Sequence, residues 1–330
     1  MRYRPLGKTG INVSEVSFGC GPVPALFTAT DWIEQQVRTI GRAVELGINW
    51  FDTAATYGAG KSEENLGHAI QELGLQVSGS VPSDRNTIHI ATKVRLFPED
   101  LADIRGAVNR SVDGSLQRLR TSRVALLQLH NSITAERGAQ HTSITPDDVL
   151  NGVLPAFEDL RRAGTVRHIG LTGLGERVPL MEVIRSGQFA TVQAPYNLLH
   201  SSAGCDGPSL PDYPPEHDLR GLFAACRQSG VGVFAIRVFA GGALAGNPPS
   251  KHTLTTKFFP LELYQRDLEA AEAQRATLRP GLTLPEVALR GVLGHPAVSS
   301  AIIGFAKPEE VEEAVSFAER GPISFDETQE

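Results

Sequence analysis

Two patterns of hydrophobic and polar positions follow each other repeatedly along the chain. Short β-branched or apolar runs alternate with longer amphipathic segments. This order is typical of repeated β–α units whose strands lie parallel in one sheet. We expect eight such strands, at Val16–Phe18, Asn49–Phe51, Ile88–Thr92, Val124–Leu129, His168–Leu171, Thr191–Gln193, Val231–Ile236 and Ser299–Ile303.

Amphipathic patterns with helical periodicity follow these strands. They lie at 33–46, 62–73, 101–120, 146–163, 178–186, 218–229, 261–293 and 308–318. Thr145 and Asp148 have the spacing of a capping box, and Pro146 stands where the first helical residue would fall. Eight strands, each followed by a helix, predict an α/β fold of the (β/α)8 TIM-barrel type, preceded by an N-terminal β-hairpin at Arg2–Val13. An open doubly wound sheet is the alternative that this pattern allows.

Stretches rich in Gly, Pro and Ser separate several of these elements. They cover 74–86, 131–145, 201–217 and 240–260, and we expect them to be loops. The last three follow strands, where a barrel enzyme builds its site. Because no stretch looks like a linker between domains, we expect one domain over residues 1–330.

Composition narrows the class of protein further. The chain has 31 Lys and Arg against 37 Asp and Glu, with no long run of one sign, which argues against a nucleic-acid partner. Cys20, Cys205 and Cys226 form no CxxC pair, and a chain of this length folds without disulfides or metals. The opening MRYRPLGKTG lacks the apolar core of a signal peptide, and no stretch approaches the about 18 apolar residues of a membrane span. We therefore expect a cytoplasmic protein with reduced thiols, no metal and no membrane partner.

Four ionisable residues lie at or just after predicted strand ends, namely Asp52, Tyr57, Lys93 and His130. In a barrel these ends share one face, so the four side chains would converge there. Each of them alone has a structural explanation, such as a cap, a packed ring or a solvated charge. All four on one predicted face indicate a catalytic site.

Reduction of a carbonyl group needs the chemistry that these four residues supply. A free Tyr has a pKa of about 10, so releasing its proton near neutral pH costs on the order of 4 kcal/mol unless a cation stabilises the phenolate. Lys93 can be that cation, held in place by Asp52, with Tyr57 as the proton donor. His130 can donate a hydrogen bond to the substrate oxygen or help to relay the proton. Glu63 and Glu64 diverge on a helix, so we expect them to be structural first-turn charges.

The sequence resembles the aldo-keto reductase family over nearly its whole length. The matching segments include FDTAATYGAGKSEENLG, IATK, LLQLH, VRHIGLTG, VQAPYNLL and AIIGFAKPEEVEEAV. The family's catalytic tetrad would fall on Asp52, Tyr57, Lys93 and His130, which are all present. The resemblance implies a (β/α)8 barrel that binds NADP(H) or NAD(H) without a Rossmann fingerprint and without a metal.

The same resemblance assigns residues to the cofactor. The predicted contacts are Gly21, Asp52, Thr172, Gln193, Ile236, Arg237, Phe239, Gly241, Gly304, Lys307, Glu310 and Glu313. The chain departs from the family at Gly173, where Asn is usual, and at Ile236 and Arg237, where an aromatic residue and Ser are usual. The Gly-rich segment 238–246 fits the loop that passes close to the pyrophosphate. Arg237 would face cofactor phosphates or an anionic substrate group, unless it is a rim residue paired with a nearby carboxylate.

The segment expected at the adenosine 2′-phosphate is unusually acidic. Lys307 is its only cation, Glu310 stands where Arg or Gln is frequent, and Ala314 replaces a frequent Asn. The helix N-terminus still favours an anion. The resemblance therefore predicts that NADP(H) is preferred, while the local charges predict weak discrimination against NAD(H).

The substrate is expected to be a small carbonyl compound or the corresponding alcohol. Aromatic residues of the loops above the barrel suggest an apolar mouth, formed by Phe27, Trp32, Phe97, Tyr213, Phe239 and Phe258. A Schiff-base aldolase with Lys93 as nucleophile is an alternative, which the pairing of Lys93 with Asp52 disfavours. A non-catalytic subunit that senses a nucleotide is another. Neither the direction of the reaction nor the oligomeric state follows from the sequence.

Overall fold

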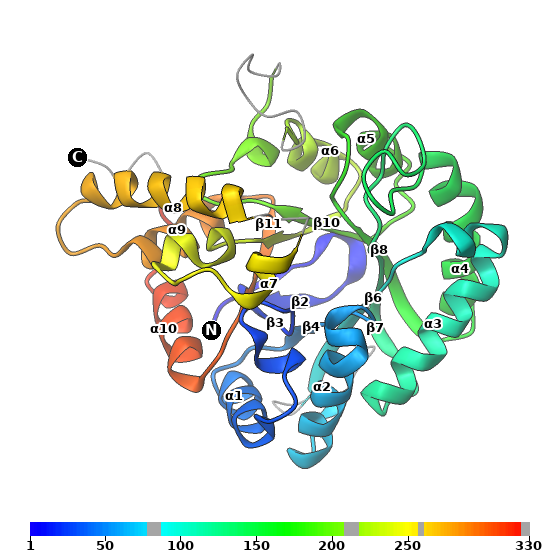
Figure 1. The fold of residues 1–330 in the computed structure, drawn as a ribbon, viewed down its shortest axis with the longest axis horizontal. Helices are drawn as coiled ribbons and strands as arrows, with labels where there is room; N and C mark the ends of the chain where they lie inside the picture. Colours follow the sequence, from blue (N-terminus) through cyan, green and yellow to red (C-terminus); the bar gives the residue numbers. More distant parts are fainter. Residues whose placement is uncertain (78–86, 208–217, 257–260, 325–330) are drawn as a thin grey trace.

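Eight parallel strands form a closed barrel. The computed structural model describes residues 1–77, 87–207, 218–256 and 261–324. In this part of the chain the barrel strands are β3 (Val16–Gly19), β4 (Trp50–Asp52), β6 (Thr87–Val94), β7 (Val124–Leu129), β8 (Val166–Thr172), β9 (Thr191–Pro195), β10 (Gly232–Ile236) and β11 (Val298–Gly304). The pairs β3–β4, β4–β6 and β11–β3 close the ring, so the open-sheet alternative is wrong (Figure 1).

Helices surround this ring on the outside, except for the short helix at Lys251–Thr255, which lies in front of the ring in Figure 1. They are α1 (Ile33–Glu45), α2 (Lys61–Glu72), α3 (Ile104–Leu119), α4 (Leu154–Arg162), α5 (Arg177–Arg185), α6 (Leu222–Gln228), α7 (Lys251–Thr255), α8 (Leu261–Ala276), α9 (Leu284–Gly294) and α10 (Pro308–Glu319). A two-residue strand, β5 (Gln76–Val77), pairs with β6. The predicted (β/α)8 barrel is confirmed.

The predicted N-terminal hairpin closes one end of the barrel. Strands β1 (Tyr3–Pro5) and β2 (Asn12–Ser14) pair antiparallel. Residues of the hairpin, Leu6, Ile11 and Val13, are buried in one cluster with Trp50 and Phe234 of the barrel strands. Figure 1 shows this hairpin in dark blue behind the middle of the ring. The amino-terminal end of the barrel is thereby filled, which leaves the other end for a site.

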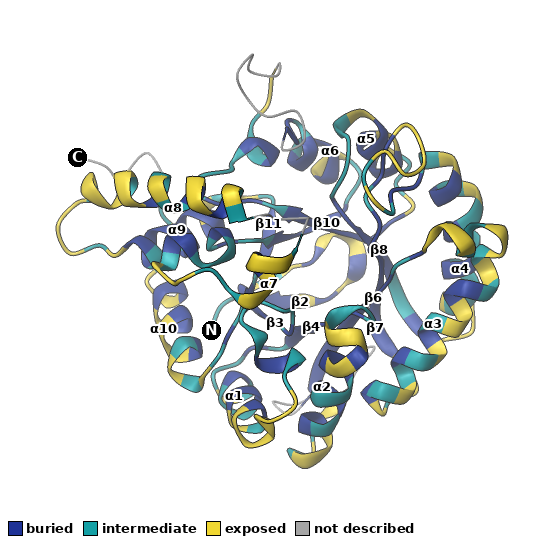
Figure 2. Cartoon of the chain, in the orientation of Figure 1, coloured by how far each residue is buried: buried dark blue, intermediate teal, exposed yellow. Residues whose placement is uncertain are grey.

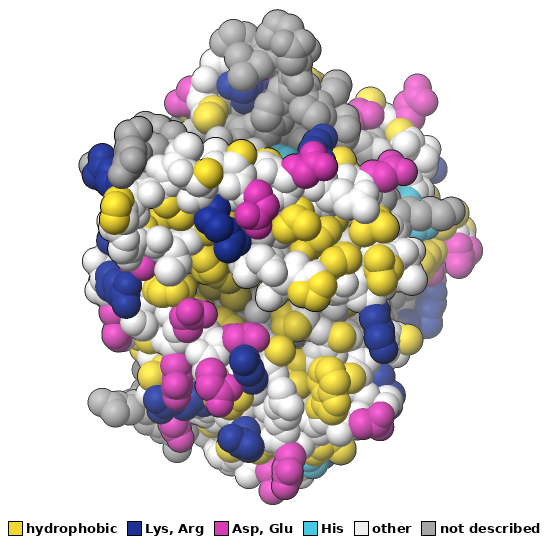
Figure 3. Space-filling view, turned by 60° about the vertical axis from the view of Figure 1, so that its left-hand side comes forward, with side chains coloured by type: hydrophobic (Ala, Val, Ile, Leu, Met, Phe, Trp, Pro, Cys, Tyr) yellow, Lys and Arg dark blue, Asp and Glu magenta, His cyan; other side chains and the backbone are white. Residues whose placement is uncertain are grey.

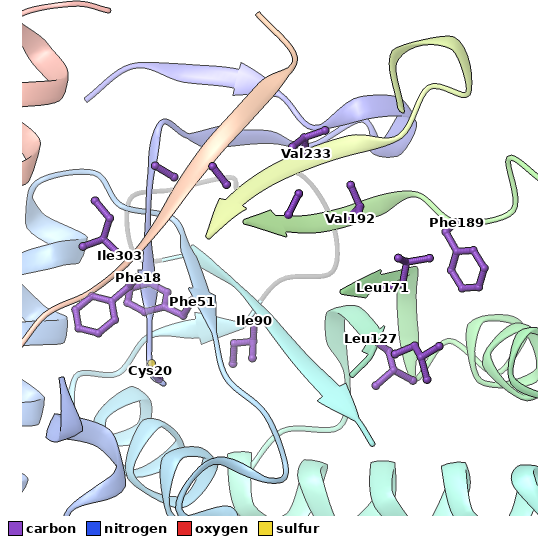
Figure 4. Packing of buried hydrophobic residues seen from close by; sticks show 14 of the residues in the cluster. Phe18, Cys20, Phe51, Ile90, Leu127, Leu171, Phe189, Val192, Val233 and Ile303 are labelled. Atoms are coloured by element: carbon purple, nitrogen blue, oxygen red, sulfur yellow. The ribbon is translucent and has the colours of Figure 1, made fainter. Parts of the chain in front are cut away.

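The main core lies between the strands and the helices. Alternate strand residues such as Phe18, Phe51, Ile90 and Leu127 point outward from the ring into this layer (Figure 4). The rings of Phe18 and Phe51 stack with centroids 5.6 Å apart. The helices turn buried faces toward the strands and exposed faces outward (Figure 2). Because strand side chains alternate, the residues between these core positions point into the barrel.

The predicted strands are all found, and β7 has the predicted bounds. The capping box is also confirmed, since the backbone N–H of Thr145 donates to Asp148 (3.0 Å) and that of Asp148 donates to the Thr145 hydroxyl (3.2 Å). The helix that follows starts at Pro146 and contains a π-helical turn at Asp148–Val153 before α4.

Three predicted helices differ from the structure, and the one predicted at 218–229 begins only at Leu222, as α6. The segment 261–293 is not one helix but two, α8 and α9, because Pro280 cannot continue a helix and Gly281 has a left-handed φ of 89°. The segment 101–120 becomes α-helical only at Ile104, after a 3₁₀ turn at Pro98–Ala102. The predicted loop at 240–260 contains a 3₁₀ segment, η8 (Ala240–Ala245), and α7.

Surface features agree with the composition. On the face drawn in Figure 3, basic and acidic side chains are interspersed and neither sign dominates. Within the described residues no helix is long and apolar enough to cross a bilayer. The cytoplasmic location stays a prediction.

Candidate active site

The four residues singled out from strand ends meet at the carboxyl end of the barrel. Asp52 is the last residue of β4, Lys93 lies near the end of β6, and His130 follows β7 directly. Tyr57 begins the 3₁₀ segment η3 (Tyr57–Gly60) after β4. The register of β4, β6 and β7 places Asp52 beside Ala91 and Lys93 beside Gln128, so these strand ends are adjacent.

Lys93 is the centre of this group. Its side chain is fully buried, and its ammonium group is ion-paired with Asp52. It also donates hydrogen bonds to the carbonyl oxygen of Thr53 (2.9 Å) and to the Tyr57 hydroxyl oxygen (3.2 Å). Burial alone would lower the pKa of Lys93, but Asp52 and Tyr57 outweigh it, and the pKa is raised. Lys93 is therefore a permanent cation beside the phenol.

Asp52 is held by three donors from different strands. Besides Lys93, the side-chain amides of Gln128 on β7 (3.1 Å) and Gln193 on β9 (2.5 Å) donate to its second oxygen. These donors hold both carboxylate oxygens in place. The carboxylate therefore fixes the position of Lys93.

Tyr57 and His130 form the outer part of the group. Their rings meet edge to face, with centroids 5.5 Å apart. Since Lys93 donates to the phenol oxygen, the phenol hydrogen can point away from Lys93 toward an incoming group. Burial, followed by the charges of Lys93 and Arg95, holds the pKa of His130 well below its usual value. A neutral imidazole keeps one N–H that can donate to a substrate oxygen.

The turn after Tyr57 explains the glycines around it. Gly58, Ala59 and Gly60 all have left-handed φ angles, of 58°, 53° and 95°. A Cβ on Gly60 would stand 2.8 Å from the Arg118 side chain. Glycine at two of these three positions lets the chain reverse with little strain, and the reversal turns the phenol back toward Lys93.

Glu63 and Glu64, at the start of α2, point in different directions, as predicted. Glu63 is buried, binds the Thr92 hydroxyl and pairs with Arg118 (2.7 Å). Glu64 pairs instead with Lys61 on the surface (2.5 Å). Both interactions are structural, and that of Glu63 ties α2 and α3 to the residue before Lys93.

Residues expected at the cofactor line the opposite side of the barrel mouth. Thr172, Gln193 and Ile236 are carried by β8, β9 and β10. The Thr172 hydroxyl donates to the carbonyl oxygen of Leu129 (3.1 Å), which leaves its oxygen free to accept. On the other flank, a Cβ on Gly21 would lie 3.7 Å from the Tyr57 ring. Gly21 therefore borders the phenol.

Arg237 follows β10 in a strained backbone conformation. Its φ is 57°, rare for a residue with a side chain, and its carbonyl oxygen accepts from the Asn197 amide (2.9 Å). Burial lowers its pKa to about 10, and the charges of Asp267 and Tyr57 act in the opposite direction. Its guanidinium group thus lies within electrostatic range of the tetrad.

The Gly-rich segment begins shortly after Arg237. Gly241 and Gly242 have φ angles of 69° and 111°, and Phe239 is half-buried against the core.

The glutamate side chains in the first turns of α10 point in different directions. Glu310 turns back and accepts a hydrogen bond from the backbone N–H of Ala306 (2.7 Å). Glu312 points away and pairs with Arg42 (2.7 Å), and Glu313 is exposed. Lys307 is exposed at the N-cap of α10.

Gly304, at the end of β11, is required by packing. A Cβ on this residue would stand only 2.3 Å from the Val23 carbonyl oxygen.

The expected apolar mouth is only partly found. Phe27 is a core residue, 1% exposed, and packs edge to face on Phe18, so its assignment to the mouth is corrected. Trp32 and Phe97 are exposed, which suits a rim. Tyr213 and Phe258 lie outside the described residues.

Two residues of the site were not predicted from the sequence. Gln128 lies two residues before His130, and Arg95 lies two residues after Lys93. The alternation of side chains within β7 would have found Gln128, whereas Arg95 lies one residue past the end of β6, where alternation no longer fixes the direction of the side chain.

The geometry can be compared with known proteins. A model of the aldo/keto reductase family matches residues 33–330, which is most of the chain. The chain belongs to the aldo/keto reductase family. It is thereby an NAD(P)-dependent oxidoreductase.

Relatives of this aldo/keto reductase agree with that assignment. It is 29% identical to the L-galactose dehydrogenase of Arabidopsis thaliana, over 96% of this chain and 88% of the relative. It is 27% identical to the oxidoreductase YqkF of Bacillus subtilis, over 96% and 91% of the two chains. In fold it is similar to an aldo-keto reductase from Bacillus halodurans, in its holo form, with a TM-score of 0.70, 24% identity and coverage of 99% and 94%.

Proposed function

We propose that this aldo/keto reductase interconverts a carbonyl compound and an alcohol, with Tyr57 as the general acid and base. The observation that carries the proposal is the buried Asp52–Lys93 pair with Lys93 3.2 Å from the phenol oxygen. A fixed ammonium group at this distance can balance the negative charge that develops on the phenol oxygen as its proton leaves. The substrate class is an aldehyde, a ketone or a sugar hemiacetal or lactone.

The cofactor is a nicotinamide nucleotide, which when bound supplies or accepts the hydride at the substrate carbon. The described residues fit such a group. Gln193 gives its amide N–H to Asp52 and keeps its oxygen for the nicotinamide carboxamide, beside the Thr172 hydroxyl. The left-handed glycines of η8 permit close approach of a pyrophosphate, and Arg237 adds a cation there. Lys307 and the start of α10 would hold the adenosine end.

The residues of the chain then act in a definite order during reduction. His130 and Tyr57 donate hydrogen bonds to the carbonyl oxygen and polarise it. As negative charge develops on that oxygen, Tyr57 transfers its proton, and the phenolate left behind is stabilised by Lys93. Asp52 keeps Lys93 in place through their ion pair. Oxidation of the alcohol uses the same groups in reverse.

The cofactor preference is expected to be weak. NADP(H) is preferred by analogy with relatives such as the Klebsiella pneumoniae aldo-keto reductase crystallised with NADPH. Glu310, however, occupies the N-terminus of α10 with its own carboxylate. Two like charges about 4 Å apart repel by about 1 kcal/mol in water. We therefore expect comparable use of NADP(H) and NAD(H).

A Schiff-base lyase is the alternative that the site disfavours. Its nucleophile would be a neutral Lys93, whereas Asp52 and Tyr57 raise the pKa of this amine. The test is a panel of aldehydes, ketones and sugars with both cofactors, followed at 340 nm, with borohydride trapping in parallel. Turnover of the nicotinamide without a trapped adduct supports the proposal. An adduct on Lys93 without nicotinamide turnover rejects it.

A further inference from the structure

Arg95 is a cation of the site that the mechanism above does not use. It follows the end of β6 at Val94, at the carboxyl end of the barrel, and stands two residues after Lys93. Its side chain is half-buried, and its Nη2 donates to the carbonyl oxygen of His130 at 3.5 Å. It therefore lies beside the group that faces the substrate oxygen.

Arg95 has no acidic partner among the residues that the structure describes. No ion pair of this side chain is present there, and its Nε is buried without a hydrogen bond. Burial lowers the pKa of Arg95, and the charge of Tyr57 only partly offsets this effect. A partly dehydrated guanidinium group without a carboxylate is costly in a protein interior. An anion that enters the site would remove that cost.

The position of Arg95 separates it from the cofactor side. In the ring order β6, β7, β8, β9, β10, the strand that leads to Arg95 lies across the barrel from the strand that leads to Arg237. The residues proposed to hold the nicotinamide, Thr172, Gln193 and Ile236, belong to β8, β9 and β10. Arg95 instead donates to the carbonyl oxygen of His130 (3.5 Å), and it lies within electrostatic range of Tyr57. It thus lies on the substrate side of the reacting groups.

We propose that Arg95 binds an oxyanion of the substrate, which makes the substrate class an aldehyde or ketone that carries a carboxylate or a phosphate. A guanidinium group pairs with either anion through two parallel hydrogen bonds. The proposal rests on the proposed function, because it places the carbonyl group between Tyr57 and His130. Arg95 is then a specificity-determining residue, and it takes no part in proton transfer.

The test compares substrates that differ only in charge. The enzyme with its nicotinamide is given 4-carboxybenzaldehyde and its neutral methyl ester, and separately glyceraldehyde 3-phosphate and glyceraldehyde. We expect the anion of at least one pair to have a kcat/KM about tenfold or more above its neutral partner, the size of one charge-assisted hydrogen bond, and to gain it through KM. The two pairs distinguish a carboxylate from a phosphate ligand.

Substitution then assigns the preference to Arg95. Arg95→Met should lower kcat/KM for the anionic substrates at least tenfold more than for their neutral partners and so remove the preference, whereas Arg95→Lys should keep part of it. The control is Arg123→Met, because Arg123 is exposed and lies just before β7 at the other end of the barrel. Binding of 4-(hydroxymethyl)benzoate and of glycerol 3-phosphate to the enzyme–NADPH complex, in which the alcohol cannot be oxidised, is followed by calorimetry and gives a readout that does not depend on turnover.

Three results would overturn the inference. One is the absence of any preference for the anions in the wild-type enzyme. Another is an equal loss for charged and neutral substrates in Arg95→Met, which would make Arg95 a positioning residue for His130. The third is unchanged binding of the anionic products by Arg95→Met. Failure of all substrates to turn over would reject the proposed function instead, while product binding would still decide the role of Arg95.

Discussion

The buried ammonium group of Lys93 contacts both the Asp52 carboxylate and the Tyr57 hydroxyl group. Because its ammonium group lies 3.2 Å from the Tyr57 oxygen, its loss should weaken the phenol as an acid while the cofactor residues stay in place. We expect Lys93→Met to lower kcat by about 10²–10⁴, the usual contribution of acid–base catalysis, with little change in cofactor affinity. Steady-state kinetics and cofactor titration measure the two effects.

A surface lysine provides the control for this prediction. Lys61→Met removes an exposed pair with Glu64, and such pairs contribute about 0–1 kcal/mol, so its activity should stay near that of the wild type. A Lys93→Met protein with normal specific activity and only reduced stability would show that Lys93 is structural.

At the scale of single residues, the sequence predicted the central contacts better than the outer ones. Asp52, Lys93 and His130 were found because parallel strands bring their carboxyl ends to one face. Phe27 was misplaced because an aromatic residue in a loop can pack either into the core or at the mouth, and composition does not decide between them. Arg95 was missed because it lies one residue past the strand, where the alternation of side chains is no longer guaranteed.

Among the elements, α2, α3 and β6 are joined by one buried carboxylate. Glu63 accepts from the Thr92 hydroxyl and pairs with Arg118, and its side chain is fully buried. We expect Glu63→Ala to lower the free energy of unfolding by about 2–4 kcal/mol, because it leaves the hydroxyl and the guanidinium group without their acceptor. Urea denaturation measures the change. With Glu64→Ala as the exposed control, equal effects of the two substitutions would contradict this account.

The N-terminus of α10 carries the prediction on cofactor preference. Glu310→Gln keeps an acceptor for the Ala306 N–H but removes the negative charge. We expect the affinity for NADP(H), relative to NAD(H), to rise by about threefold to tenfold, as a repulsion of about 1 kcal/mol is removed. Fluorescence titration with both nucleotides measures this ratio.

Glu312→Gln is the matched control, because Glu312 pairs with Arg42 away from the helix start. A wild-type preference above about a hundredfold for NADP(H) would show that Glu310 does not approach the phosphate, since one such repulsion is worth about tenfold. In that case Lys307→Ala should weaken NADP(H) and leave NAD(H) nearly untouched.

At the scale of elements, most boundaries followed from periodicity, and the errors have local causes. The α8–α9 break was missed because α8 has only a weak apolar face, so the end of its pattern is hard to recognise. Its signals were present in Pro280, Gly281 and the N-cap Thr283, whose hydroxyl accepts from the Glu286 N–H (3.4 Å). The π-helical turn before α4 has no such signal, since it depends on contacts between elements that are distant in sequence.

For the whole molecule, buried histidines predict how stability depends on pH. Burial lowers the pKa of His168 to about 4, and nearby Arg167 and Arg161 act in the same direction. The folded protein therefore binds fewer protons here than the unfolded chain between pH 4 and pH 6.5, and stability is lost as the pH falls through this range. Between pH 7 and pH 5 the loss should be roughly 1–2 kcal/mol, allowing for partial exposure of the side chain.

Urea denaturation of His168→Gln at both pH values tests this. The variant should lose less stability between pH 7 and pH 5 than the wild type does. The control is His141→Asn, because His141 is exposed and its left-handed φ of 51° suits Asn. An unchanged pH dependence in His168→Gln would mean that His168 does not titrate differently in the folded protein.

The barrel places Tyr57 beside Lys93 at its carboxyl end. The central claim is that Tyr57 transfers the proton to the substrate oxygen. The most direct test is the rate of nicotinamide oxidation at 340 nm by Tyr57→Phe, with a substrate that the wild-type enzyme reduces. Because the substitution removes only the hydroxyl group, kcat should fall by about 10²–10⁴ while the nucleotide dissociation constant stays within about twofold. A variant that keeps more than about a tenth of the wild-type kcat would contradict the claim, since the proton would then come from another group.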